Sequence, residues 1–207
     1  MSSQPPQPFQ TPQPFQPPQP PSTPDVPATR FFIAVLPPDE IAQYADRVIQ
    51  ELTDRYGTAA AKAPPHITLQ APFLWNLADV ATLEACLQSI AERSIPVPIT
   101  LSGFGSFAPR VLFINVAKTP ELLALQSVVM SELENKLGIV DPSAKRRPFA
   151  PHLTVASRKM TRQIFKQAWA DLKPRSFEFE FVGDRLTLLI HDGHRWQLRH
   201  HFELGKA

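Results

Sequence analysis

Two short stretches of the chain repeat one pattern: a proline followed by histidine, an aliphatic residue, threonine and a second aliphatic residue. The first is Pro65-His66-Ile67-Thr68-Leu69 and the second is Pro151-His152-Leu153-Thr154-Val155. Residues i and i+2 of a strand share a face, so each stretch predicts a histidine beside a threonine, with the aliphatic residues turned toward a core. A single pair of this kind is more often structural than catalytic, but two matching copies favour a shared site.

Histidine can take or give a proton near neutral pH, because its ordinary pKa is about 6.5. Two histidines at one site can divide the labour of base and acid, while two threonine hydroxyls can donate hydrogen bonds to phosphate oxygens. We therefore expect His66 and His152 to catalyse a displacement at phosphorus, with Thr68 and Thr154 binding the phosphate. The residues alone leave open which histidine is the acid.

Basic residues flank both copies of the pattern. Lys62 precedes the first copy, Lys145-Arg146-Arg147 precedes the second, and Arg158 follows it. We expect Lys62, Arg147 and Arg158 to attract a polyanionic substrate and to lower the pKa of the nearby histidines. The alternatives are a solvated loop and, for Arg158, a surface salt bridge. The aromatic residues near the motifs are candidates for stacking on a base, with core packing as the alternative: Phe73, Trp75 and Phe149.

The order strand, helix, His-x-Thr strand, helix, strand occurs twice, over about residues 30–106 and 111–205. The two histidines are 152 − 66 = 86 residues apart, close to the length of one unit. Helix signals repeat as well, with Asp39 before the first helix and Gly57 after it, and Thr119 and Gly138 around a later one. We expect an α+β fold with two lobes related by a pseudo-two-fold axis. Each lobe would carry a mainly antiparallel sheet covered by helices, and the His-x-Thr strands would face each other across a central cleft.

Proline and glutamine dominate the first 27 residues, where Gln-Pro-Phe-Gln occurs twice. This composition cannot build a packed core, so we expect a disordered or polyproline-II tail over residues 1–27 and a folded domain over 28–207. A solvated tail is one interpretation. A partner that binds proline-rich segments is the other.

Composition also excludes several classes of protein. No apolar run approaches the ~20 residues of a membrane helix, so we expect a cytoplasmic protein without membrane contact. We also expect a monomer. A net charge of +2 is too small to indicate duplex binding. The single cysteine, Cys86, excludes an internal disulfide and has the spacing of a buried helix position. The remaining histidines lack zinc-ligand spacing, so we expect no metal and leave them out of the site: His191, His194, His200 and His201.

With their flanking residues, the paired Pro-His-Ile-Thr-Leu and Pro-His-Leu-Thr-Val motifs resemble the 2H phosphoesterase superfamily, and in particular its LigT-like, 2′-5′ RNA ligase branch. The resemblance covers roughly Arg30 to Leu204. It implies a bilobal fold without cofactor, His66 as acid, His152 as base, and RNA or a nucleotide with a 2′,3′-cyclic phosphate as the partner.

The activity implied by this resemblance is a metal-independent cyclic phosphodiesterase, with reversible 2′-5′ ligation as a secondary activity. Many relatives follow the first motif with Phe-Leu-Gly, where this chain has Gln70-Ala71-Pro72-Phe73, so the substrate stays open. The alternative function is a non-catalytic module that binds nucleotide or RNA ends.

Overall fold

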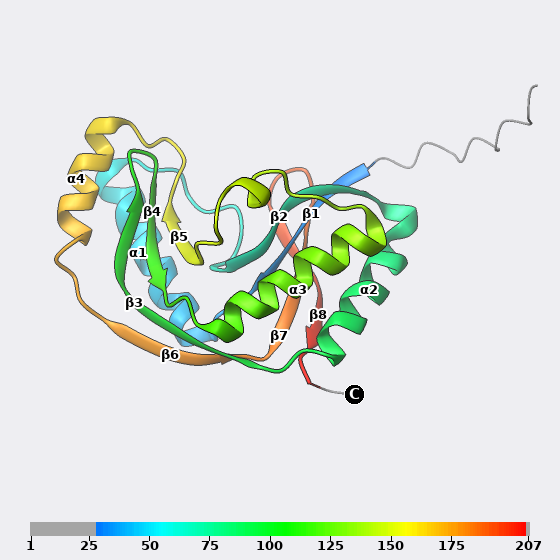
Figure 1. Ribbon diagram of the computed structural model, residues 1–207. Helices are drawn as coiled ribbons and strands as arrows, with labels where there is room; N and C mark the ends of the chain where they lie inside the picture. The colour runs from blue at the N-terminus through cyan, green and yellow to red at the C-terminus, as the bar shows by residue number, and fades with distance from the viewer. Residues whose placement is uncertain (1–27, 206–207) are drawn as a thin grey trace, which may run out of the picture.

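The computed structural model describes residues 28–205, which form the expected α+β fold: one curled antiparallel sheet of eight strands with four helices (Figure 1). The tail expected over residues 1–27 lies outside the described residues. Within residues 28–205, no helix is long and apolar enough to cross a membrane. The elements are β1 (Ala28–Val35), α1 (Asp39–Tyr56), β2 (Ile67–Asn76), α2 (Val80–Glu92), β3 (Val97–Phe107), β4 (Val111–Val116), α3 (Pro120–Leu137), β5 (His152–Ala156), α4 (Arg162–Leu172), β6 (Glu178–Gly183), β7 (Arg185–His191) and β8 (Trp196–Glu203), with short 3₁₀ turns at Leu77–Asp79 and Ala144–Arg146.

The two His-x-Thr strands are neighbours at the centre of the sheet. Strand order is β6-β3-β4-β5-β2-β1-β7-β8, and β2 and β5 join through the antiparallel pair Ile67 and Leu153. The sequence predicted that these strands would face each other from opposite walls of a cleft. Instead, they meet side by side within one sheet. The four-strand halves also exchange strands, since β3 pairs with β4 and β7 pairs with β1. Each half of the sheet thus draws strands from both sequence repeats.

The helices pack against one face of the sheet, where the main core lies. Figure 1 shows α1 and α4 together at one side of the molecule and α2 and α3 together at the other. α1 follows β1 yet contacts β5, and α3 follows β4 yet contacts β2, so these helices cross to the other repeat's His-x-Thr strand. The aliphatic residues of both motifs reach this core, as the alternation predicted: Ile67, Leu69, Leu153 and Val155.

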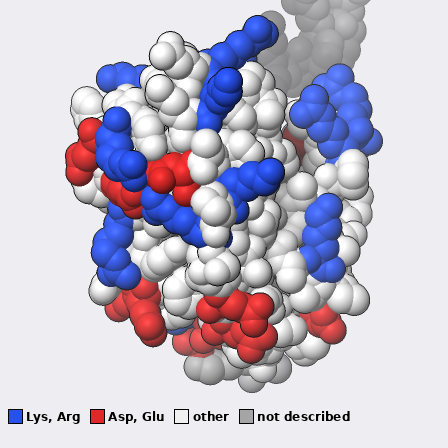
Figure 2. Space-filling model, turned by 90° about the vertical axis from the view of Figure 1, so that its left-hand side faces the viewer, with Lys and Arg blue, Asp and Glu red and all other residues white. Residues whose placement is uncertain are grey.

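The opposite face of the sheet carries only a small apolar cluster within the described chain, formed by Phe32, Ala34 and Leu189. The segments before β2 and before β5 lie on the upper side of Figure 1, together with the β3–β4 and β7–β8 turns. In Figure 2, Asp and Glu form one group at the left of the upper half and another along the lower part of the face shown, whereas Lys and Arg extend to its upper edge. The upper edge of this face, toward the side of these loops, is therefore basic.

The helix ends follow the sequence signals closely. Thr119 and Thr161 accept hydrogen bonds from the backbone N–H groups three residues later, which fixes the starts of α3 and α4. Gly57 and Gly138 end α1 and α3 in the left-handed conformation, at φ 67° and 66°. Asp39 is the first residue of α1 and not its cap, because Pro38 occupies the cap position without a side-chain hydrogen bond.

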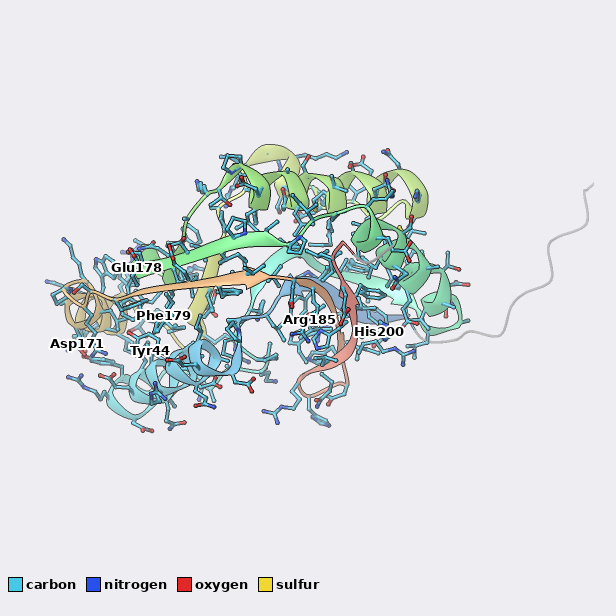
Figure 3. The ribbon with its side chains drawn as sticks, turned by 90° about the horizontal axis from the view of Figure 1, so that it is seen from below. Tyr44, Asp171, Glu178, Phe179, Arg185 and His200 are labelled. Carbon is cyan, nitrogen blue, oxygen red and sulfur yellow. The ribbon has the colours of Figure 1, made fainter. Side chains whose placement is uncertain are left out.

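An aromatic cluster fixes α1 to the outer strands. The ring centroids of Tyr44 and Phe179 are 5.1 Å apart, and those of Tyr44 and Phe177 are 4.9 Å apart. Figure 3 shows Tyr44 on α1 and Phe179 on β6 from below. Phe104 of β3 packs on Phe177 at 5.0 Å. Since β3 and β6 come from different repeats, these aromatic contacts help to hold the exchanged strands together.

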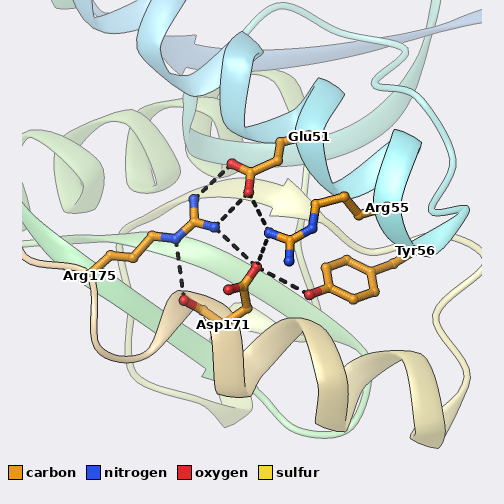
Figure 4. Close-up of polar contacts among 5 residues, drawn as sticks. All are labelled: Glu51, Arg55, Tyr56, Asp171 and Arg175. Carbon is orange, nitrogen blue, oxygen red and sulfur yellow. Dashed lines mark hydrogen bonds and ion pairs between the residues drawn. The ribbon is translucent and has the colours of Figure 1, made fainter.

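An ion-pair network joins α1 to the end of α4 (Figure 4). Glu51 accepts hydrogen bonds from both terminal nitrogens of Arg175, at 2.8 and 2.6 Å, and one from Arg55 at 2.9 Å. Asp171 accepts from Arg55, Arg175 and the Tyr56 hydroxyl. Such bidentate geometry is stronger than a single contact between exposed charges.

We expect Glu51→Gln to lower the free energy of unfolding at pH 7 by about 1 kcal/mol, a modest effect because solvent screens this partly exposed carboxylate. Hydrogen bonding to Arg175 lowers the pKa of Glu51 from 4.5 to about 2. A lowered carboxyl pKa adds stability above pH 4.5, and this is lost as the pH falls through 2. Urea unfolding curves of native protein and variant should therefore converge between those values. Glu178→Gln, at an exposed position, is the control, and a pH-independent difference for Glu51→Gln would contradict the prediction.

Candidate active site

The register of β2 and β5 brings both histidines and both threonines together. Because Ile67 lies opposite Leu153 in an antiparallel pair, His66 lies opposite Thr154 and Thr68 lies opposite His152. Directly opposite residues have Cβ atoms about 5 Å apart. All four side chains point away from the main core and are half-buried. The face opposite the helices therefore carries a square in which each histidine has a threonine along its own strand and another across from it.

Backbone carbonyls fix the tautomer of both histidines. His66 donates its Nδ1–H to the Pro64 carbonyl at 2.7 Å, and His152 donates its Nδ1–H to the Ala150 carbonyl at 2.8 Å. A carbonyl oxygen only accepts, so the proton of the neutral ring is on Nδ1 and Nε2 keeps its lone pair. The proline before each histidine restricts the residue that supplies this carbonyl to an extended conformation. The Pro-His dipeptide thus orients the ring as well as placing it.

Aromatic rings hold each imidazole from the side. The Phe32 ring lies 4.7 Å from the His66 ring, and Phe107 and Phe113 lie 5.0 and 5.1 Å from the His152 ring. Phe113 reaches its position across Gly105, where an added Cβ would fall 2.3 Å from the Phe113 ring. Gly105 therefore permits a close approach that any larger residue would prevent.

Burial lowers the pKa of His66, and the charge of His152 lowers it further, against the opposing effect of the Pro64 hydrogen bond. The sequence analysis expected a lowered pKa from the flanking cations. The direction agrees, but the main cause is loss of solvation as the ring packs beneath Phe32. Without a ligand, the neutral form of His66 is favoured.

An NMR titration should show the His66 ring protons changing below pH 6.5 in the free protein. Binding of a nucleoside 2′-phosphate should raise this pKa, because an anion beside the ring favours the imidazolium. His152→Ala should raise it as well by removing a like charge, whereas the exposed His194→Ala should leave it unchanged. A His66 pKa at or above 6.5 in the free protein would contradict the burial argument.

A pocket of about 500 Å³ extends from His66 and Thr154. Lys62 and Arg158 also line it, so these predicted binding residues lie with one histidine and one threonine. The remaining predicted site residues, Thr68, His152 and Arg147, are not part of its lining. Arg147 is exposed and follows the short turn Ala144–Arg146. The site is therefore asymmetric, although its motifs are repeated.

Comparison with known proteins identifies the family. The family model described as the 2′-5′ RNA ligase superfamily matches residues 37–195 of the 207. The chain belongs to the 2′-5′ RNA ligase superfamily. Within it, the chain is a 2H phosphoesterase. A protein of Bacillus cytotoxicus whose name assigns it to the phosphoesterases is 32% identical over 174 residues, covering 81% of this chain and 96% of the relative.

Two solved structures have a fold similar to that of this chain. TT0787 of Thermus thermophilus has a TM-score of 0.60 at 22% identity, covering 85% of this chain and 98% of its own. LigT of E. coli without ligand has a TM-score of 0.61 at 19% identity, covering 86% of this chain and 98% of its own. At these identities the likeness establishes the fold alone.

Arg30, His191 and Trp196 line the pocket, but the sequence did not identify them as site residues. His191 had been left out of the site with the other histidines that lack zinc-ligand spacing. Arg30, Phe32 and Ala34 are spaced two residues apart and therefore share one face of β1. The face of Arg30 could thus have been predicted from the two-residue period of a strand. The pairing of β1 with β7, which places His191 beside Arg30, has no local signal in the sequence.

The aromatic residues near the motifs pack inward. Phe73, Trp75 and Phe149 contact the main core, and Phe73 stacks on Phe31 at 6.3 Å. Core packing, the alternative to base stacking for these residues, is therefore confirmed for Phe149 and observed for Phe73 and Trp75. β2 continues to Asn76, beyond the predicted strand, and this continuation carries Phe73 and Trp75 to the core.

No group of three or more His, Cys, Asp or Glu residues that could hold a metal occurs within residues 28–205. Cys86 is buried in α2, as expected, and burial raises the pKa of its thiol. A thiol of this kind is a poor nucleophile and packs as a small apolar residue.

Proposed function

We propose that this 2H phosphoesterase opens 2′,3′-cyclic phosphates at the ends of RNA or nucleotides and leaves a 2′-phosphate. The observation that carries the proposal is the square of two histidines and two threonines, with both Nε2 atoms left free by the Nδ1 hydrogen bonds. Two imidazoles supply a base and an acid, and two hydroxyls supply donors for the non-bridging phosphate oxygens.

In this reaction, one imidazole Nε2 takes a proton from water as the water oxygen forms a bond to phosphorus. The bond between phosphorus and O3′ breaks, and the other imidazole gives its proton to O3′. The 2′-phosphate stays on the ribose, and proton exchange with solvent restores both rings. Attack by a ribose 5′-hydroxyl in place of water would give a 2′-5′ linkage, which we treat as a secondary activity.

The asymmetric pocket supports one assignment of the two roles. The ribose carries the leaving O3′, and the pocket of about 500 Å³ is lined by His66 and not by His152. His66 then protonates O3′, and His152 activates the water, which is the assignment that the family resemblance implies. The bound anion offsets the lowered pKa of His66 and favours its protonated form. A structure titled as E. coli LigT with 3′-AMP supports a nucleotide as substrate. We place the reaction in the cytoplasm.

The direct test is incubation of the purified protein with adenosine 2′,3′-cyclic phosphate and with a short RNA ending in a cyclic phosphate, with EDTA present. We expect adenosine 2′-phosphate and not the 3′ isomer, with one ¹⁸O per phosphate when the reaction is run in labelled water. Tight binding of both compounds without turnover would reject the enzyme in favour of a binding module.

A further inference from the structure

We propose that the far end of the pocket binds a second phosphate of the substrate. The preferred substrates would then be nucleotides or RNA ends that carry a 5′-phosphate or 5′-phosphodiester on the same nucleoside as the cyclic phosphate. This second site rests on the proposed function, which positions the cyclic phosphate between the two histidines. The residues that would bind the second phosphate line the pocket beyond His66: Arg30, Lys62 and Arg158.

Strand geometry places Arg30 one step beyond the catalytic square. Phe32 contacts His66, and Arg30 lies two residues earlier on the same face of β1, about 7 Å along the strand. Its guanidinium nitrogen Nη2 lies 3.2 Å from Nδ1 of His191, and its Cζ lies 5.7 Å from the centre of the Trp196 ring. Arg30 is therefore held over the pocket by the β7–β8 hairpin.

The segment before β2 forms the wall of the pocket and is fixed at both ends. The backbone N–H of Trp196 donates to the Lys62 carbonyl at 2.7 Å. At the other end, Nη2 of Arg158 donates to the Ala60 carbonyl at 2.5 Å, and the N–H of Ala59 donates to the Arg158 carbonyl. This segment thus joins the hairpin near Arg30 to the end of β5 near Thr154, and it brings the three cations to one cavity.

The charge of this cavity is one-sided. The described residues that line it include three Lys or Arg and no Asp or Glu, and Arg30, Lys62 and Arg158 form no salt bridge within residues 28–205. By contrast, Arg55, Arg93, Arg175 and Arg199 all pair with carboxylates elsewhere on the molecule.

The size of the cavity also supports binding of a second phosphate. At about 500 Å³ it lies within the range of pockets that hold a whole small molecule, and it is larger than a single cyclic phosphate needs. Unpaired cations grouped around such a cavity favour a second anionic group. The 5′ position of the nucleoside is the nearest place on the substrate that can supply one.

The test compares kcat/KM for adenosine 2′,3′-cyclic phosphate with and without a 5′-phosphate. We expect the native protein to prefer the 5′-phosphorylated substrate by about tenfold or more, the value of one or two charge-assisted hydrogen bonds. Arg30→Gln and Lys62→Gln should bring this ratio toward one. Lys166→Gln, which removes an equal charge from the exposed face of α4, should keep the native ratio. A native ratio near one would overturn the proposal and leave the proposed function standing.

If no turnover is found, measurements of binding affinity still test the second phosphate site separately from the proposed enzymatic activity. The dissociation constants of adenosine 2′,5′-bisphosphate and adenosine 2′-phosphate, measured by calorimetry, should differ by about tenfold in the native protein and much less in Arg30→Gln. Such a difference without turnover would retain the second phosphate site and reject the enzyme. Equal affinities would overturn the second site. Circular dichroism of each variant would establish that the protein is folded.

Discussion

Replacement of either His66 or His152 by alanine should lower kcat for opening of a 2′,3′-cyclic phosphate by about 100-fold or more, the contribution expected of a general acid or base. Each ring presents a free Nε2, and no other described histidine lies in the square. KM should change much less than kcat, because the threonines and cations still bind the phosphate. Rates of product formation from adenosine 2′,3′-cyclic phosphate measure the effect.

The control for these variants is His194→Ala, an exposed position in the β7–β8 turn that does not line the pocket. It should retain native activity. Loss of activity in only one of the two active-site variants would contradict a division of labour between the histidines, and a single catalytic histidine would then be the better description.

A substrate with sulfur in place of the bridging O3′ separates the two roles. A thiolate leaves without being protonated, because its pKa is far below that of an alkoxide. We expect the defect of His66→Ala to shrink strongly on this substrate, while the defect of His152→Ala stays. The reverse result would show that His152 is the acid and would reject the assignment based on the pocket.

Leu153→Ala should lower the free energy of unfolding by about 2–5 kcal/mol, the cost of emptying a fully buried leucine site. Leu153 is 0% exposed and lies opposite Ile67 at the junction of the two halves of the sheet. Such a loss is a large share of the roughly 5–15 kcal/mol by which a domain is stable. Urea unfolding followed by circular dichroism measures it.

The matched control is Leu74→Ala on β2, because Leu74 is 65% exposed and its removal opens no cavity. The change in its free energy of unfolding should stay within about 0.5 kcal/mol, as for most exposed positions. Similar losses in both variants would show that the junction between β2 and β5 is not the well-packed centre of the fold that we describe.

Local patterns in the sequence were sufficient to predict most elements and the pairing of each histidine with a threonine on its own strand. The two-residue period of a strand places His66 and Thr68 on one face and Ile67 in the core, whatever the rest of the fold does. Threonine before a helix and glycine after it have their own backbone chemistry, so α3 begins, and α1 and α3 end, at the predicted residues.

Pairings between distant segments were decided only by the tertiary structure. The register that places His66 opposite Thr154 depends on two strands whose histidines are 152 − 66 = 86 residues apart in the sequence. The exchange of β3 and β7 between the halves of the sheet likewise leaves no local pattern, because strand pairing is set by the best total burial of all the elements together.

The basic pocket shows the same division. Lys62 and Arg158 could be proposed from the sequence because they flank the motifs. Arg30 and His191 are 161 residues apart in the sequence, so their contact could not be predicted from it. The sequence by itself determined that each histidine would share a strand face with one threonine, His66 with Thr68 and His152 with Thr154. Only the fold decided that open, positively charged space would lie beside His66 and not beside His152, where Phe107 and Phe113 pack instead.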